Sequence, residues 1–200
     1  MLTQREVFRQ GLHLVLGIVI AIGFYLDIIS PLAMFLGIII GGLASLIYKR
    51  YPLPGFNWCL KKFEREEMCK TFPGRGLVFY FVGVLLVMQL FPKDIALAAI
   101  KILACGDSVS HVVGERFGHI QNIFNGRSKK LFEGTIAGIL AGLVGAVFFV
   151  PFTEALMGSF VAMIAEVVEF DLNGKPLDDN LIVPLVAGTV IYIVRMVLGI

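Results

Sequence analysis

The sequence predicts an all-α, polytopic integral membrane protein with a helical bundle of about seven transmembrane helices. Of the 200 residues, 58% are hydrophobic and 16% are charged, whereas soluble domains average about 45–50% apolar and about 25% charged residues. The mean hydropathy of +0.87 is correspondingly high. The apolar residues are also gathered into long runs. This chain length predicts one membrane-embedded domain over residues 1–200.

The apolar runs predict the individual crossings, and they cover residues 12–29, 31–48, 76–91, 95–105, 134–152, 155–170 and 181–200. Spanning the hydrocarbon core takes roughly 20 helical residues, with about 17 as a lower limit. The first, second, fifth and seventh runs reach this length, the third is marginal, and the fourth and sixth are short. Because no small-residue cleavage site ends the first run, a retained helix is expected there.

The basic residues predict the orientation. With the N-terminus in the cytosol, seven crossings leave residues 1–11, 49–75, 106–133 and 171–180 on that side, and these segments hold 14 of the 17 lysines and arginines. An excess of lysine and arginine in cytosolic connections is the positive-inside rule. The polar motifs are therefore expected to face the cytosol. A net charge of +2 is too small to indicate a nucleic-acid partner.

The segment between the second and third runs has its own pattern. Residues 60–68 mix apolar and charged side chains at near-helical spacing, and Phe56 and Trp58 precede them. This pattern is typical of an amphipathic helix at the membrane interface. A solvated connecting helix is the alternative, and the sequence leaves both open.

The short fourth run leads into Gly106-Asp107-Ser108. A carboxylate close to hydrocarbon is energetically expensive, so Asp107 is expected to face a water-filled cavity or a cation. If the helix continues, Asp107, His111 and Glu115 recur every fourth residue and share one face. The alternative is a cytosolic helix end with a solvated polar face.

Glycines and cations follow in the next connection. Gly114 and Gly118 precede Lys129 and Lys130, and Glu133 stands where the fifth run begins. Glycines let backbone N–H groups and ammonium groups approach phosphates closely, and a carboxylate suits the positive end of a helix. The chain has neither a GxxxxGK[ST] nor a GxGxxG motif, so a nucleotide would have to be held in another way.

Asp178-Asp179-Asn180 precede the last run. Their oxygens are ligands of the kind that Mg²⁺ takes, and the same residue types also favour a helix N-cap. Acidic groups that can bind a metal and basic groups that can bind phosphate thus share one side of the membrane. This combination is typical of phosphoryl transfer.

These residues together resemble the CTP-dependent lipid kinases, a group that includes dolichol kinase, phytol kinase and the CTP-dependent diacylglycerol kinases. The ordered motifs are Gly106-Asp107-Ser108, Gly114, Gly118, Lys129-Lys130-x-x-Glu133-Gly134, Glu166 and Asp178-Asp179-Asn180-x-x-x-Pro184. Arg9-x-x-x-His13-x-x-x-Gly17 and Gly76-x-x-x-Tyr80-Phe81-x-Gly83 look like the early motifs of the family. Gln10, His111 and Leu131 depart from its pattern, and His111 stands where a small residue is common.

The resemblance implies a CTP-dependent kinase that phosphorylates the hydroxyl of a polyprenol, a dolichol-like or another long-chain lipid alcohol at the cytosolic face. It would use Mg²⁺, with CTP, the lipid alcohol and membrane lipids as partners. The implied catalytic residues are Asp107, Lys130 and Glu133, and Asp107 would act as base or as metal ligand. The implied nucleotide-binding residues are Gly106, Ser108, Gly114, Gly118, Lys129, Gly134 and Asn180. The implied metal ligands are Asp107, Asp178 and Asp179, and further candidates are Arg9, His13, His111 and Glu166.

Two other functions compete with this hypothesis. The same motifs are similar to the membrane cytidylyltransferases that form a CDP-lipid from CTP and a lipid phosphate. A small ion-coupled transporter would instead show an internal repeat and polar residues on both sides of the midplane, and the sequence shows no repeat. Small residues allow helices to pack closely within one subunit or in a homodimer, and the candidates are Gly37, Gly41, Gly42, Gly138, Gly142 and Gly145.

Overall fold

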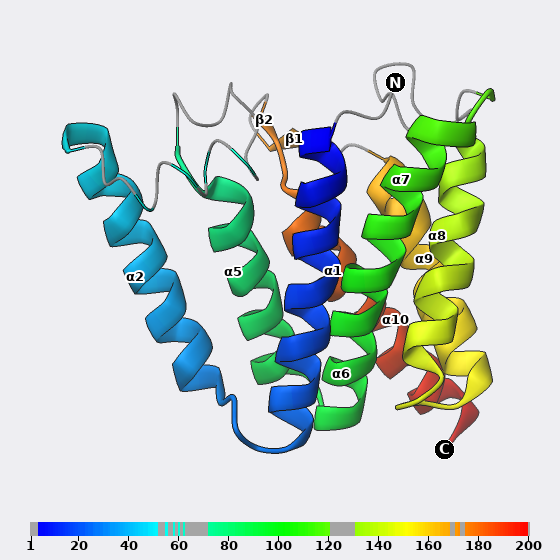
Figure 1. The fold of residues 1–200 in the computed structure, drawn as a ribbon. Coiled ribbons are helices and arrows are strands. Elements are labelled where there is room, and N and C mark those ends of the chain that lie inside the picture. The colour runs from blue at the N-terminus through cyan, green and yellow to red at the C-terminus, as the bar shows by residue number, and fades with distance from the viewer. Residues whose placement is uncertain are drawn as a thin grey trace.

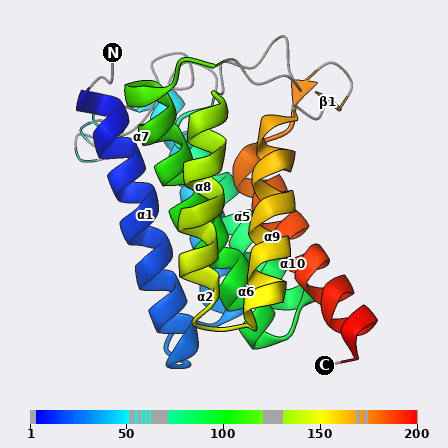
Figure 2. The same cartoon turned by 90° about the vertical axis from the view of Figure 1, so that its right-hand side faces the viewer.

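The computed structural model describes residues 4–51, 72–120, 131–168, 171–172 and 175–199, together with residues 55, 58, 60 and 62. These residues form a bundle of helices that run roughly alongside one another (Figures 1 and 2). The bundle consists of α1 (Gln4–Tyr25), α2 (Pro31–Arg50), α5 (Arg75–Leu90), α6 (Lys93–Lys101), the π-helix η1 (Ile102–Asp107), α7 (Ser108–Phe117), α8 (Phe132–Ala146), α9 (Phe152–Val167) and α10 (Asp179–Leu198). A short antiparallel hairpin pairs β1 (Asp171–Leu172) with β2 (Lys175–Pro176). The prediction of an all-α membrane bundle is confirmed.

Four helical segments are long and apolar enough to cross a membrane: Gln4–Tyr25, Pro31–Tyr48, Lys93–Phe117 and Asp179–Leu198. The helices α5, α8 and α9 run alongside them (Figure 1). The chain starts α1 at one end of the bundle and finishes α10 at the other, as an odd number of crossings requires. The cytosolic orientation of the first of these ends remains a prediction.

The fourth crossing extends beyond its apolar run, which is one of the two alternatives that the sequence left open. The apolar run ends at Cys105, but α6, η1 and α7 continue as a 25-residue helical span from Lys93 to Phe117. Asp107 therefore lies inside a helix and is 5% exposed. The end of the apolar run does not mark the end of the helix, because neighbouring helices cover the polar residues that follow it.

The α6 helix forms the centre of the bundle. Its residues Ile95 to Ile100 are almost completely buried, and it packs against α1, α5, α8 and α10. The small alanines at positions 96, 98 and 99 allow these neighbours to approach closely. By contrast, α2 lies at the edge of the bundle, packs on α5 and exposes large apolar side chains (Figure 1). Apolar residues thus fill the inside and also face outward, as expected in lipid.

Several glycines serve helix contacts within the chain. A Cβ at Gly138 would collide with Met163 and Ser110, and a Cβ at Gly142 would collide with Ser159. Gly37 and Gly41 lie against Phe81 and Val78. Tight packing inside one subunit therefore accounts for these small residues, and the homodimer remains a prediction.

At the opposite end of the bundle, Arg195 has a different environment from the one its sequence position indicates. An arginine in the last apolar run is expected to extend toward the far interface. Instead, its guanidinium donates two hydrogen bonds to Glu154, at 3.1 and 2.8 Å, and its Nη2 atom lies 2.7 Å from Asp94 Oδ2. Glu154 is 0% exposed. The cluster joins the start of α6, the start of α9 and the end of α10.

Candidate catalytic and metal-binding site

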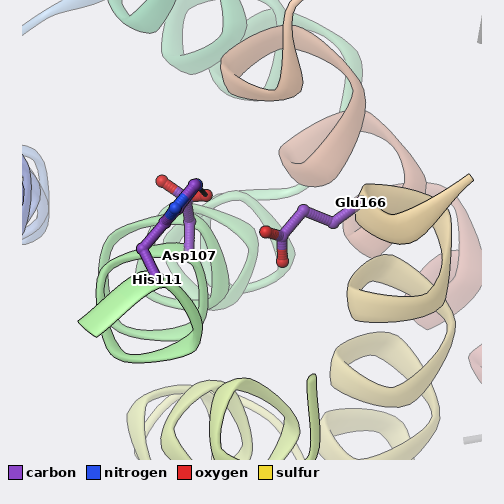
Figure 3. A group of neighbouring side chains, drawn as sticks. All are labelled: Asp107, His111 and Glu166. Atoms are coloured by element: carbon purple, nitrogen blue, oxygen red, sulfur yellow. Dashed lines mark ion pairs between the residues drawn. The ribbon is translucent and has the colours of Figure 1, made fainter. Parts of the chain in front are cut away.

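Three side chains from two crossings converge in the half of the bundle where α1 begins. Asp107 and His111 lie one turn apart on the η1–α7 segment, and Glu166 extends toward them from the last turn of α9 (Figure 3). One ligand atom from each residue lies within 4.8 Å of the others. Asp107 and Glu166 are 5% and 1% exposed. The arrangement is a group of hard and borderline ligands that could hold a metal ion.

The π-helix η1 helps to place Asp107. A π-helical turn contains more residues than an α-helical turn, and such segments are frequent at functional sites. Because η1 ends at Asp107, it changes the angular register between α6, which packs in the core, and α7, which carries His111. Gly106 and Ser108, on either side of Asp107, are also buried. The composition of residues 102–107 gives no signal for this turn.

On the α1 side, His13 approaches the same carboxylate. Its Nε2 atom lies 3.5 Å from Asp107 Oδ2, while His111 Nε2 lies 3.5 Å from Asp107 Oδ1. The His13 ring meets the Tyr80 ring edge-on, with centroids 4.5 Å apart. The Tyr80 hydroxyl occupies the space beside Gly17. The two early motifs, residues 9–17 and 76–83, therefore meet at Asp107.

Glu166 is held by a hydroxyl group that the sequence did not single out. The Ser110 hydroxyl lies 3.2 and 3.3 Å from the two carboxylate oxygens of Glu166 and donates to them. Ser110 itself is buried between α7 and α8, since its carbonyl oxygen lies against Gly134. Its spacing three residues after Asp107 was the available signal, because that spacing puts both residues near one face of a helix.

The glycines predicted to bind the nucleotide lie mainly at helix contacts. Gly134 lies against the backbone of Gly114, and Gly106 lies against the backbone of Gly138. At Gly118 a side chain would collide with Leu131. The small size of these residues already has a packing explanation, so their contact with a nucleotide remains a prediction.

Glu133 joins the end of α7 to the start of α8. Its carboxylate accepts hydrogen bonds from the backbone N–H of His119, at 2.9 Å, and of Ile120, at 3.2 Å. Glu133 stands just before the apolar run of α8, and hydrogen bonds from its own backbone N–H and from that of His119 lower the pKa of its carboxyl group. The ionised carboxylate therefore stabilises this connection, and a direct role in catalysis remains a prediction.

The cluster before α10 forms a helix cap. Asp178 is the N-cap residue, and its Oδ1 atom accepts from the backbone N–H of Asn180 at 3.2 Å and from Asn180 Nδ2 at 2.9 Å. Arg75 Nε lies 3.4 Å from Asp178 Oδ2. Burial raises the pKa of the Asp178 carboxyl group, against the opposing effect of Asn180 and Arg75. Among the described residues, Asp178 and Asp179 do not join the ligand group of Asp107.

The remaining candidates are Arg9, which pairs with another residue of α1, and the lysines of the connection before α8. Arg9 pairs with Glu6 of the preceding turn, with Nε 3.1 Å from Glu6 Oε2. The backbone carbonyl of Gln10 accepts a hydrogen bond from the Ser108 hydroxyl at 3.2 Å, which ties α1 to α7. Lys129, Lys130 and most of the predicted amphipathic segment 60–68 lie outside the described residues.

Comparison with known proteins adds independent information. An uncharacterised protein of Methanocaldococcus jannaschii is 31% identical over 192 residues, which cover 94% of this chain and 93% of that protein. The CTP-dependent diacylglycerol kinase 1 of Schizosaccharomyces pombe is 28% identical over 141 residues, 60% of each chain. The phytol kinase of Synechocystis sp. is 30% identical over 157 residues, 76% of this chain and 62% of the kinase.

The chain thus spans about three fifths of the length of the two kinases. No family model matches the chain, and no solved structure matches it. The similarity to the kinases agrees with the ordered motifs, of which residues 9–17, 76–83 and 106–108 and Glu166 come together around Asp107. The relatives named CTP-dependent diacylglycerol kinase and phytol kinase support the assignment of the chain to the family of the CTP-dependent lipid kinases.

Proposed function

We propose that this protein is a CTP-dependent kinase that phosphorylates the hydroxyl group of a long-chain lipid alcohol, with a polyprenol or dolichol-like alcohol as the preferred class. The observation that carries the proposal is the convergence of Asp107, His111 and Glu166 inside the bundle of a chain related to lipid kinases. The similarity to lipid kinases supports CTP as the phosphate donor and a lipid alcohol as the acceptor. The buried group of three side chains supports the position at which the two substrates meet.

The reaction needs few covalent participants from the protein. The alcohol oxygen forms a bond to the γ-phosphorus while the bond from that phosphorus to the oxygen of the β-phosphate breaks, so CDP leaves. The hydroxyl proton passes to Asp107 or to one of the two imidazoles that flank it, because His13 and His111 each lie 3.5 Å from its carboxylate. Positioning and charge stabilisation supply most of the catalysis in such transfers.

A divalent cation, Mg²⁺ in this proposal, accompanies the triphosphate. Asp107 and Glu166 fit such an ion because carboxylate oxygens are its preferred protein ligands. Asp178 and Asp179 remain candidate ligands in a complex with nucleotide. When bound, the cation would neutralise charge on the phosphates. Lys129 and Lys130 are proposed to neutralise phosphate charge as well, and Glu133 and Asn180 to shape the nucleotide-binding side.

The lipid acceptor fits the position of the site. Asp107 lies within a helix long enough to cross the membrane, so a hydroxyl group can reach it while its hydrocarbon tail stays among the helices. Arg5, Arg9, Arg75 and Arg116 belong to the segments at this end of the bundle, and the positive-inside rule assigns that end to the cytosol. Soluble CTP would then reach the site from the cytosol.

The proposal is tested with purified protein and CTP that carries one label on the γ-phosphate and another on the cytidine. The acceptors are polyprenol, dolichol, phytol and diacylglycerol, each in mixed micelles. We expect the γ-label in the lipid and the cytidine label in CDP. Cytidine label joined to a lipid phosphate, with release of pyrophosphate, would instead establish a cytidylyltransferase. The absence of label in all four lipids would refute the kinase.

A further inference from the structure

We propose that His111 is a direct ligand of the cation, so that this site has mixed nitrogen and oxygen ligands and binds Mn²⁺ more tightly than Mg²⁺. The inference shares its site with the proposed function, but its test needs neither nucleotide nor lipid. Its basis is the group formed by Asp107, His111 and Glu166, which contains two carboxylates and one imidazole with ligand atoms within 4.8 Å of one another.

The separations suit a single ion after small side-chain movements. His111 Nε2 and Asp107 Oδ1 are already 3.5 Å apart, and adjacent ligands of an octahedral ion with bonds of 2.0–2.1 Å are about 3 Å apart. Asp107 and His111 share one face of one helix, so they move together. Glu166 faces them from α9 (Figure 3), and the Ser110 hydroxyl fixes the direction of its carboxylate. Hydrogen bonds of this kind orient metal ligands.

A second observation points to a ligand at the same place. The His13 side chain is nine-tenths buried, and its Nε2 atom has no hydrogen-bond partner among the described residues although it points at Asp107 Oδ2 from 3.5 Å. An imidazole nitrogen at this position can take part in a hydrogen bond with a suitable partner. Divalent cations of this kind keep several bound waters, so a water on a cation held by Asp107 could donate a hydrogen bond to His13 Nε2 without making His13 a ligand.

The ligand types decide which ion is favoured. Mg²⁺ strongly prefers oxygen ligands and keeps several waters, whereas Mn²⁺ is also suited by carboxylates but belongs to the first-row transition metals, which bind mixed nitrogen and oxygen sites. One nitrogen among three protein ligands should therefore favour Mn²⁺. We expect Mn²⁺ to bind about tenfold more tightly than Mg²⁺, and we expect that preference to fall about tenfold when the imidazole is removed.

The chain is well suited to a spectroscopic test because it has only three histidines, His13, His111 and His119. Protein purified through an affinity tag without histidine is loaded with Mn²⁺, and pulsed electron paramagnetic resonance detects directly bound ¹⁴N. Each histidine is replaced by leucine in turn. We expect the nitrogen signal in wild-type protein and in the His13→Leu and His119→Leu variants, and its loss in His111→Leu.

Two controls keep the outcome decisive. His111→Asp retains a ligand oxygen, so it should still bind Mn²⁺ but without the nitrogen signal, even if His111→Leu fails to fold. Mg²⁺ affinity, measured by competition against Mn²⁺, should change little in His111→Asp. Absence of Mn²⁺ binding in the wild-type protein, or a nitrogen signal that persists in His111→Asp, would overturn the inference. Because no turnover is measured, an inactive kinase would not be confused with either result.

Discussion

Replacing Gly17 by alanine should disturb both the stability and the site, because Gly17 is where α1 contacts the helices around Asp107. A Cβ atom at this position would come far closer than 3.0 Å to Ala104 Cβ and to the Tyr80 hydroxyl, whereas ordinary contacts are 3.4–4 Å. The neighbours must therefore move by about 1 Å. Overpacking of this kind costs about 1–3 kcal/mol.

The same displacement should also lower the rate of the reaction. Tyr80 packs edge-on against His13, and His13 lies 3.5 Å from Asp107. A shift of about 1 Å at reacting groups can lower a rate by about 10²-fold. We therefore expect Gly17→Ala to lose roughly 2–12 °C in Tm, at about 2–4 °C per kcal/mol, and about 10²-fold in lipid phosphorylation. The assays are thermal unfolding in detergent and transfer of label from γ-labelled CTP.

Gly11 offers a matched control on the same helix. Nothing lies within 4 Å of a Cβ built at Gly11, so Gly11→Ala should be neutral or should stabilise α1 by up to about 1 kcal/mol through helix propensity. Adding Tyr80→Phe to Gly17→Ala removes one of the two colliding atoms and should recover part of the stability. If Gly17→Ala matches Gly11→Ala in both assays, α1 does not pack on Tyr80 and Ala104 as described.

Three further predictions concern other parts of the bundle. Arg195→Met should destabilise the protein by about 3–5 kcal/mol in thermal unfolding, because it leaves Glu154 buried without its partner; Glu154→Gln added to it should recover much of the loss, and an unchanged Tm in Arg195→Met would contradict this. Asp178→Ala should cost about 1 kcal/mol, whereas Asp178→Asn should keep most of the stability, since both Asp and Asn cap helices well; equal Tm losses would argue against a cap. Because the pKa of Glu133 is lowered in the folded protein, its stabilisation of the connection between α7 and α8 is complete above the ordinary pKa of a glutamate and is lost as the pH falls through the pKa of the folded state. Protection of the His119 and Ile120 amides from hydrogen exchange should therefore decrease over this pH range in wild-type protein. In Glu133→Gln the protection should be independent of pH.

Much of the fold could be predicted from hydropathy, because a segment that crosses lipid must form the hydrogen bonds of its backbone N–H and C=O groups within itself, and a helix does so. The helix α2 (Pro31–Arg50) follows its apolar run, residues 31–48, closely, whereas α1 (Gln4–Tyr25) begins eight residues before its run, residues 12–29, and ends four residues before the end of that run. The fourth crossing did not follow this rule. Hydropathy ends it at Cys105, whereas tertiary packing carries the helix through Asp107 to Phe117. The π-helix η1 was not predictable because no residue in it requires such a turn.

The candidate site was predictable residue by residue but not in its grouping. Asp107 and His111 follow from helical spacing, and Glu166 came from the ordered motifs. Only the structure brings Glu166 against them, because α7 and α9 both pack on α8, and helical spacing within one segment does not predict this packing. Asp178 could be a cap or a metal ligand from sequence, and its hydrogen bonds to Asn180 establish the cap. Glu154 was missed because one polar residue in an apolar helix has no characteristic spacing, whereas the spacing of Ser110 after Asp107 was a signal that the sequence analysis did not use.

The measurement that tests the central claim most directly is the rate of phosphate transfer from CTP to a polyprenol in Asp107→Asn, compared with Glu115→Gln. Both substitutions replace a carboxylate by an amide on the same helical segment, but Glu115 is exposed and Asp107 is buried beside His13 and His111. We expect Asp107→Asn to lose at least about 10²–10⁴-fold in rate, with Tm close to that of the wild type, and Glu115→Gln to stay within about twofold. Equal rates in the two variants would contradict a catalytic site centred on Asp107.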